Sequence, residues 1–193
     1  MTVLRDMTVL RDITNDKHRE VENTELIKYL FKGEVKKEVY VAYLYELLHI
    51  YTVLEEVAKE TGALEGLDGI ERTQAIRDDL DELNPFYERD ITESTARYLK
   101  YLKELSADES RKHLVMAHVY CRHMGDLFGG KLLSRLAPGE GRAYQFDDRP
   151  ALIKAFSQKV TEDLGDEANI SFGYFIDIFK DLWQVIKAEN ADL

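Results

Sequence analysis

The chain has 193 residues, a net charge of −11 and one cysteine, Cys121, which fits a single compact domain of high solubility. The negative charge argues against nucleic acid as a partner, and a lone cysteine excludes an internal disulfide framework. No apolar run reaches the roughly 18 residues of a membrane span, and the N-terminus lacks the apolar segment of a signal peptide. We therefore expect a soluble, cytoplasmic protein that does not associate with membranes.

Apolar residues recur at spacings of three and four along most of the chain. No segment shows the period-two alternation that is typical of a strand between turn residues. This pattern predicts one all-α domain over residues 1–193. In chain order, the predicted helices cover residues 8–31, 35–61, 69–83, 93–106, 109–136, 150–163 and 167–188.

Some ends of these elements carry recognisable signals. Thr92 is a candidate N-cap for the helix over 93–106, and Asp108 for the helix over 109–136, because their side-chain oxygens can accept from free backbone amides. At the start of the chain the hexapeptide MTVLRD occurs twice in succession. We predict that residues 1–7 form a disordered or duplicated extension.

The stretch GDLFGGKLL, residues 125–133, can be interpreted in two ways. Gly125, Gly130 and Lys131 have the spacing of a phosphate-binding loop, but Leu132 replaces the hydroxyl residue that would contact magnesium. Apolar residues keep helical spacing through the glycines, which favours a helix. Three glycines inside a helix cost about 3 kcal/mol relative to alanine. Since a missing Cβ lets backbone come close to another helix or to a flat cofactor, we expect one of these beside the glycines.

Three motifs resemble one family. The segment AHVYCRHMGDLFGGKLL, 117–133, resembles the distal-helix signature of the heme oxygenases. KHREVENTELIKYLFKG, 17–33, is similar to their proximal helix, and LLHIYTVLEE, 47–56, to their second helix. Order and spacing agree over most of residues 8–188. The resemblance implies a multi-helix bundle in which heme is sandwiched between the first helix and a kinked, glycine-containing distal helix.

The same resemblance implies an activity. A heme oxygenase opens heme oxidatively to biliverdin, carbon monoxide and free iron, with dioxygen and electrons supplied from outside. Heme is then both substrate and cofactor, and a donor protein provides the reducing electrons.

Residues of the distal side receive roles from the resemblance. Asp126 would hold a water network that delivers protons during oxygen activation, and Arg122 and Tyr51 would join it. For Arg122 and Tyr51, ordinary packing or a surface ion pair is the alternative. Three glycines would line the pocket with backbone: Gly125, Gly129 and Gly130.

On the proximal side, the resemblance assigns His18 as the axial ligand of the heme iron, since neutral imidazole suits iron. Glu22 lies one turn later and would accept from the other ring nitrogen, which fixes the tautomer. An exposed helix carboxylate is the alternative for Glu22.

The anionic heme propionates need hydrogen-bond donors at the pocket mouth. The resemblance assigns Arg11, Tyr120 and Lys154 to this task. Gln158 stands where the family has an arginine, which leaves one propionate contact in question, and Lys159 follows it.

Several phenylalanines also bear on the pocket. Phe172 and Phe179 match aromatic positions over the heme edge, although a stripe at this spacing forms the core of most proteins. Phe175 departs from a family asparagine. Phe128 replaces a family serine, and it would either reshape the distal pocket or pack behind it.

Two other classes of protein remain open. A non-catalytic heme-binding or carrier protein would keep His18 and the pocket but would not need Asp126. A di-iron oxidase of the same fold pairs two E-x-x-H motifs. Glu46 and His49 form one such motif, and the sequence offers no second. The Gly-Asp pair with the double glycine favours the enzyme.

The resemblance to short bacterial, cyanobacterial and phage forms implies a ferredoxin or another reductase as electron donor, and a biliverdin-using reductase downstream. Because ferredoxins are acidic, docking needs a basic surface on this acidic chain. The candidates are Lys28, Lys32, Lys36, Lys37, Arg111, Lys112, Lys131 and Arg135.

Overall fold

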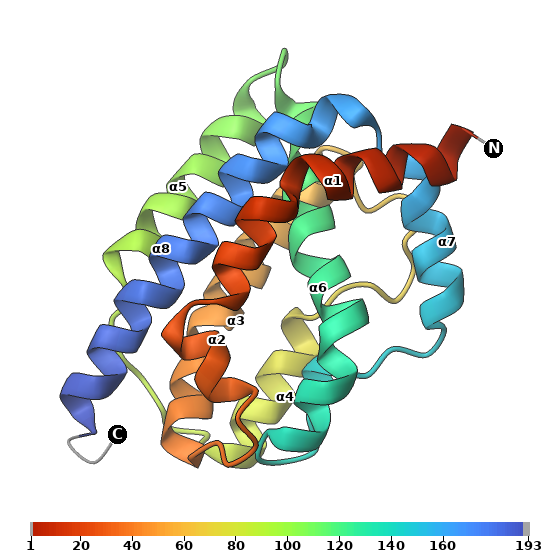
Figure 1. Cartoon of the computed structure of the whole chain (residues 1–193). Coiled ribbons are helices and arrows are strands. Elements are labelled where there is room, and N and C mark those ends of the chain that lie inside the picture. The colour runs from red at the N-terminus through yellow and green to blue at the C-terminus, as the bar shows by residue number, and fades with distance from the viewer. Residues whose placement is uncertain (1, 191–193) are drawn as a thin grey trace.

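The computed structural model describes residues 2–190, and the side chains of residues 7–190. Every regular element in this part of the chain is helical (Figure 1), which confirms the predicted all-α class. None of these helices combines the length and apolar composition that crossing a bilayer requires. The elements are α1 (Thr2–Glu22), α2 (Glu25–Leu30), α3 (Lys37–Glu60), α4 (Thr73–Leu83), α5 (Glu93–Ala107), η1 (Lys112–Leu114), α6 (Val115–Leu136), η2 (Arg142–Tyr144), α7 (Arg149–Lys159), η3 (Glu162–Leu164) and α8 (Gly165–Glu189), where η marks a short 3-10 helix.

The predicted helix over 8–31 is in fact two helices, α1 and α2, with a break at Asn23 and Thr24. The Asn23 side-chain amide donates to the Arg19 carbonyl at 2.8 Å, and the Thr24 hydroxyl donates to the Val21 carbonyl at 2.8 Å. Short polar side chains that bond to the backbone in this way compete with helical hydrogen bonds. The prediction of one continuous helix is therefore wrong.

The start of the chain also differs from the prediction. α1 begins at Thr2, so the repeated hexapeptide is helical from this residue on, whereas the predicted first helix began at residue 8. That residues 1–7 form a duplicated extension stays a prediction. Met1 and residues 191–193 lie outside the described residues.

Other helix ends shift for local reasons. α4 begins at Thr73 and not at 69, because Gly69 has a left-handed φ of 82° that an α-helix cannot contain. α7 ends at Lys159 and not at 163, because Val160 is extended.

The two predicted N-caps have different outcomes. Thr92 is the N-cap of α5, and its side chain accepts from the Thr95 amide, as predicted. Asp108 instead bonds to the Ser110 amide in the turn after α5, and η1 precedes α6.

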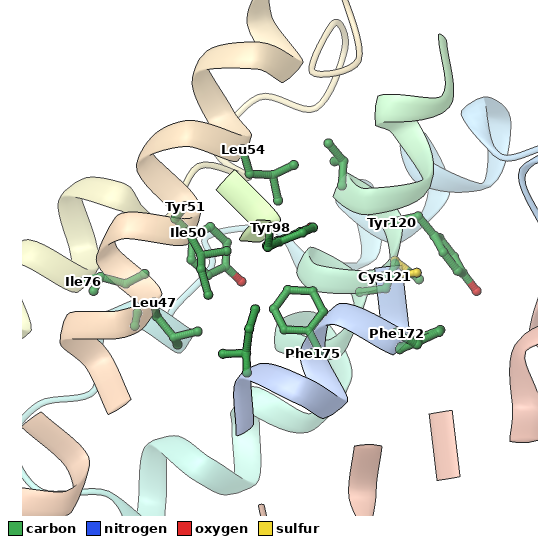
Figure 2. Packing of buried hydrophobic residues seen from close by; sticks show 14 of the residues in the cluster. Leu47, Ile50, Tyr51, Leu54, Ile76, Tyr98, Tyr120, Cys121, Phe172 and Phe175 are labelled. Atoms are coloured by element: carbon green, nitrogen blue, oxygen red, sulfur yellow. The ribbon is translucent and has the colours of Figure 1, made fainter. Parts of the chain in front are cut away.

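The helices pack around α3, α6 and α8. In Figure 1, α8 runs beside α5 and α1, and it packs against α1, α2, α5 and α6. α1 and α6 share α8 as a neighbour, but they contact each other little within the described residues. Figure 2 shows Tyr51 and Tyr98 inside the core, with Tyr120 and Phe172 at its margin. A ligand between α1 and α6 would therefore lie against this margin.

Candidate functional site

α6 and α3 bring together three polar side chains that the sequence predicted to act as one network. Asp126 lies one turn after Arg122, and Arg122 Nη2 donates to Asp126 Oδ1 at 2.7 Å. Arg122 Nε donates to the Tyr51 hydroxyl at 2.9 Å, and this hydroxyl donates to Asp126 Oδ2. Each side chain bonds to the other two, and we call these three residues the distal triad.

Burial makes the pairing of the distal triad necessary. Asp126 is 3 % exposed and Tyr51 is fully buried. Burial alone would lower the pKa of Arg122, but the Asp126 carboxylate outweighs it and holds this pKa well above its ordinary value. Burial, reinforced by Asp126, raises the pKa of Tyr51 well above its ordinary value. In the distal triad, Arg122 therefore stays positively charged beside the Asp126 carboxylate, and the Tyr51 phenol stays protonated.

Aromatic rings of α8 lie behind the distal triad. The guanidinium carbon of Arg122 is 5.2 Å from the ring centroid of Phe175, a cation–π distance. The phenylalanine at a position where an asparagine was expected thus lies against a cation whose side chain is only 12 % exposed. Phe179, a predicted contact of the cofactor edge, is 1 % exposed and packs against Phe175. Its ring belongs to the core.

The glycines of α6 have different surroundings. A Cβ on Gly125 would meet no atom within 4 Å, so this position faces open space. A Cβ on Gly129 would lie 4.0 Å from Phe31 Cζ, whereas one on Gly130 would overlap Tyr144 Cδ1 at 2.7 Å. Gly125 leaves room for a ligand. Gly130, a predicted cofactor contact, is instead required where α6 packs closely on η2.

Phe128 does not have the packed position that was one of the two expected from the sequence. It is 64 % exposed, and Leu132, one turn later on α6, is 51 % exposed. Its ring therefore lies at the surface and does not pack behind the distal side, while a role in shaping that side stays a prediction.

α1 presents the predicted proximal residues at its surface. The His18 side chain is 50 % exposed, and its Nδ1 lies 3.6 Å from Glu22 Oε1. The ring of His18 stands edge-on to Phe172 of α8, with centroids 5.6 Å apart. Because Glu22 occupies the Nδ1 side, Nε2 remains available for a ligand.

The residues predicted at the pocket mouth are less tightly grouped. Burial raises the pKa of Tyr120 to about 12, and the charge of Arg11 opposes this rise. Lys154 and Gln158 are exposed, one turn apart on α7. Lys159 donates to a loop carbonyl at 2.8 Å, so it does not take the place of the missing arginine.

Sequence reasoning missed Arg149, at the start of α7. Its Nη1 donates to the Leu127 carbonyl at 2.5 Å and reaches the Asp126 carbonyl at 3.4 Å, while its Nη2 donates to the Tyr144 carbonyl. The guanidinium thus holds the backbone of α6 at the residue that carries the buried carboxylate. Nothing in the surrounding FDDRP sequence signals this contact.

A second missed pair lies beside the distal triad. His123 of α6 is fully buried, its Nε2 is 3.5 Å from Glu55 Oε1 of α3, and its ring is perpendicular to that of Tyr51. The helical spacing of His123 from Asp126 was the only available signal.

The E-x-x-H motif of α3 has a structural task. Glu46 is buried, and its Oε1 accepts from the Thr92 amide at 2.8 Å and from the Thr92 hydroxyl at 2.6 Å, where α5 begins. His49 packs edge-on against Tyr45. Among the described residues, no three His, Cys, Asp or Glu side chains gather to hold a metal. The di-iron interpretation therefore has no ligand set here.

Comparisons with known proteins agree on one family. The family model described as Heme oxygenase matches residues 6–181. Heme oxygenase 2 of Synechocystis sp. is 30 % identical over an alignment of 210 positions that covers 93 % of this chain and 83 % of the relative. Heme oxygenase 1 of Rattus norvegicus is 27 % identical over an alignment of 213 positions that covers 95 % of this chain and 73 % of the relative. The crystal structure of heme oxygenase-1 from Synechocystis sp. PCC6803 in complex with heme aligns with a TM-score of 0.80 at 25 % identity, covering 94 % of each chain.

Proposed function

The chain belongs to the heme oxygenase family, and we propose that it opens heme to biliverdin, carbon monoxide and free iron with dioxygen and electrons from a donor protein. One observation supports this most directly. Asp126 is buried and held by two partners, directly after Gly125, which faces open space. A heme carrier needs a histidine and a pocket, but it has no use for a fixed, buried carboxylate beside the pocket.

The residues of this chain fit heme as a ligand. His18 offers Nε2 of an imidazole on the proximal side, and Gly125 leaves room for a flat ring on the other. Arg11, Tyr120 and Lys154 supply donors for two anionic propionates. When bound, heme supplies the redox-active iron and the ring that is opened.

The distal triad would control the proton supply. Tyr51 keeps its proton and Arg122 keeps its charge, so both hold Asp126 in one position. A carboxylate oxygen can accept more than one hydrogen bond. Asp126 can therefore also hold a proton donor over the backbone at Gly125, and the missing side chain keeps this space open.

A heme titration tests the activity. Apo-protein with one equivalent of hemin should develop a Soret band, and a reductant in air should replace it with the spectrum of biliverdin. A Soret band that persists under reductant and dioxygen would leave a heme carrier. A protein that takes up no hemin would leave neither function.

A matched pair of variants tests the role of Asp126. Asp126→Ala should still bind hemin, but its ring opening should slow by about 100-fold or more, the scale of a lost proton-transfer group. Asp177→Ala removes an exposed acid from α8 and should leave turnover unchanged. Normal turnover in Asp126→Ala would remove this residue from the mechanism.

We propose that the electron donor is an acidic protein such as a ferredoxin, acting in a reducing cytoplasm. Of the basic candidates, Arg111 bonds to side chains of α5 and α8, and Lys112 pairs with Glu109 at 2.7 Å. Lys131 and Arg135 are exposed, one turn apart on α6. Lys131→Glu with Arg135→Glu should raise the KM for ferredoxin, whereas Lys112→Glu should change it little. An unchanged KM would place the docking surface elsewhere.

A further inference from the structure

α6 carries two fully buried histidines, and their surroundings differ in one chemical respect. His118 Nδ1 lies 3.0 Å from the Tyr98 hydroxyl, and its Nε2 lies 3.0 Å from Glu167 Oε1. A hydroxyl can donate, so a neutral imidazole with its proton on Nε2 satisfies both contacts. Burial accordingly lowers the pKa of His118 despite the carboxylate beside it.

His123 faces only acceptors. Its Nδ1 lies 3.1 Å from the Val119 carbonyl, and its Nε2 lies 3.5 Å from Glu55 Oε1. A carbonyl cannot donate a hydrogen bond, and a neutral imidazole has only one N–H. One ring nitrogen of a neutral His123 would therefore point a lone pair at an oxygen, unless Glu55 carried a proton.

The contacts of Glu55 favour its ionised form over such a protonated one. One of its oxygens accepts from the Arg72 amide, and the other accepts from the Thr73 amide at 3.2 Å and the Thr73 hydroxyl at 2.6 Å. Burial would raise the pKa of Glu55, but the hydrogen bonds from His123, Thr73 and Arg72 outweigh it and lower this pKa. An ionised Glu55 leaves the imidazolium as the form of His123 that satisfies both of its contacts.

This ring touches the distal triad. The rings of His123 and Tyr51 are 5.1 Å apart and perpendicular, at 89°. Tyr51 in turn donates to Asp126. We propose that His123 is a positioning residue: as an imidazolium held between the Val119 carbonyl and the Glu55 carboxylate, it fixes the ring of Tyr51 and so the hydroxyl that orients Asp126. The proposal rests on the proposed function for its catalytic consequence, but not for the charge of His123.

The charge can be measured without heme. Apo-protein labelled with nitrogen-15 in its histidines should show, at neutral pH, protons on both ring nitrogens of His123 and on only one of His118. Single protonation of His123 would overturn the proposal. Assignment by the variants His123→Gln and His118→Phe makes the two signals distinguishable.

The consequence can be measured with matched variants. His123→Phe keeps a ring beside Tyr51 but removes both N–H donors and the charge, and His118→Phe makes the same change at the other buried site. In His123→Phe the Glu55 carboxylate still accepts from the Thr73 amide, and in His118→Phe the Glu167 carboxylate still accepts from the Tyr101 hydroxyl. Ring opening should slow about tenfold in His123→Phe, which is the lower end of the roughly 10–100-fold range for loss of a residue that orients a functional group. In His118→Phe it should slow less than about twofold. His123→Gln restores an amide donor toward Glu55 and should recover part of the rate.

A spectroscopic readout separates positioning from general loss of structure. The pH midpoint of the acid–alkaline transition of the ferric heme complex should move in His123→Phe and remain in place in His118→Phe. Hemin affinity should stay within about twofold in both, since the two histidines are buried residues of α6 and the proposed iron ligand His18 is on α1. If His123→Phe does not fold, His123→Gln decides, and a wild-type midpoint and rate in it would overturn the proposal. If the wild-type complex does not open heme at all, the proposed function fails, while the protonation and the midpoint still test His123.

Discussion

On the distal side of the site, Tyr51 and Asp126 are buried, the Arg122 side chain is 12 % exposed and all three are bonded to one another, whereas on the proximal side the His18 and Glu22 side chains are 50 % and 61 % exposed. The protein alone therefore completes the distal hydrogen bonds, but it leaves the proximal ligand open. Buried polar groups must be paired in the folded chain itself, while an exposed imidazole has water until a ligand covers it. Distal substitutions should consequently destabilise the apo-protein, and proximal ones should mainly weaken heme binding.

The largest effect should come from breaking the distal triad. Arg122→Met leaves the Asp126 carboxylate buried without its cation, and removal of one partner of a buried ion pair typically costs about 3–5 kcal/mol of unfolding free energy. Urea unfolding of the apo-protein, followed by circular dichroism, measures this loss. Arg97→Met removes an exposed partner of Glu93 and should cost less than about 1 kcal/mol. Equal losses in the two variants would contradict the contrast between the sides.

A pair of glycine substitutions should act in opposite directions. Gly130→Ala would place a Cβ 2.7 Å from Tyr144 Cδ1, and overpacking of this kind costs about 1–3 kcal/mol. Gly125→Ala meets no atom and should stabilise the helix by up to about 1 kcal/mol while weakening hemin binding. Unfolding curves and hemin titrations measure both. If Gly125→Ala bound hemin with unchanged affinity, the open space at this residue would not be the ligand's position.

A smaller change in free energy should follow from removing the proximal ligand. His18→Ala should weaken hemin binding by at least about tenfold, which is about 1.4 kcal/mol. The free energy of unfolding of its apo-protein should change by less than about 0.5 kcal/mol, because the side chain is half exposed and stands edge-on to Phe172. Added imidazole should restore the Soret band. A large loss of apo-protein stability would contradict the assignment of His18 as an iron ligand that has no structural role in the apo-protein.

The sequence predicts features that depend on local helical spacing, and it misses those that depend on particular side-chain contacts. Helical spacing of apolar residues located every long helix, because burial of one face determines that pattern. The sequence did not predict the break at Asn23 and Thr24, because side chains that bond to backbone carbonyls leave the spacing of apolar residues unchanged.

The same distinction holds in the site. Tyr51, Arg122 and Asp126 were found through a motif, but His123 pairs with Glu55, 68 residues away, and Arg149 bonds only to carbonyls, which every residue has. Gly130 shows a further limit: a glycine in the sequence reports a missing side chain, but not whether Tyr144 or a ligand occupies the space.

The last effect concerns the buried histidine that lies apart from the distal triad. Burial lowers the pKa of His118 in the folded protein, so below the unfolded value of about 6.5 the unfolded chain binds a proton that the folded chain does not. Stability therefore falls as pH falls through this window, by at most one proton, or about 1.4 kcal/mol per pH unit. The lowered pKa values of Glu55 and Glu167 act only below their own unfolded value of about 4.5. Urea unfolding of wild type and His118→Phe between pH 7.5 and 5 should hence give free energies that converge as the pH decreases. A constant difference would mean that His118 takes up its proton in the folded protein as readily as in the unfolded chain, and the two buried histidines of α6 would then not differ in charge as their contacts require.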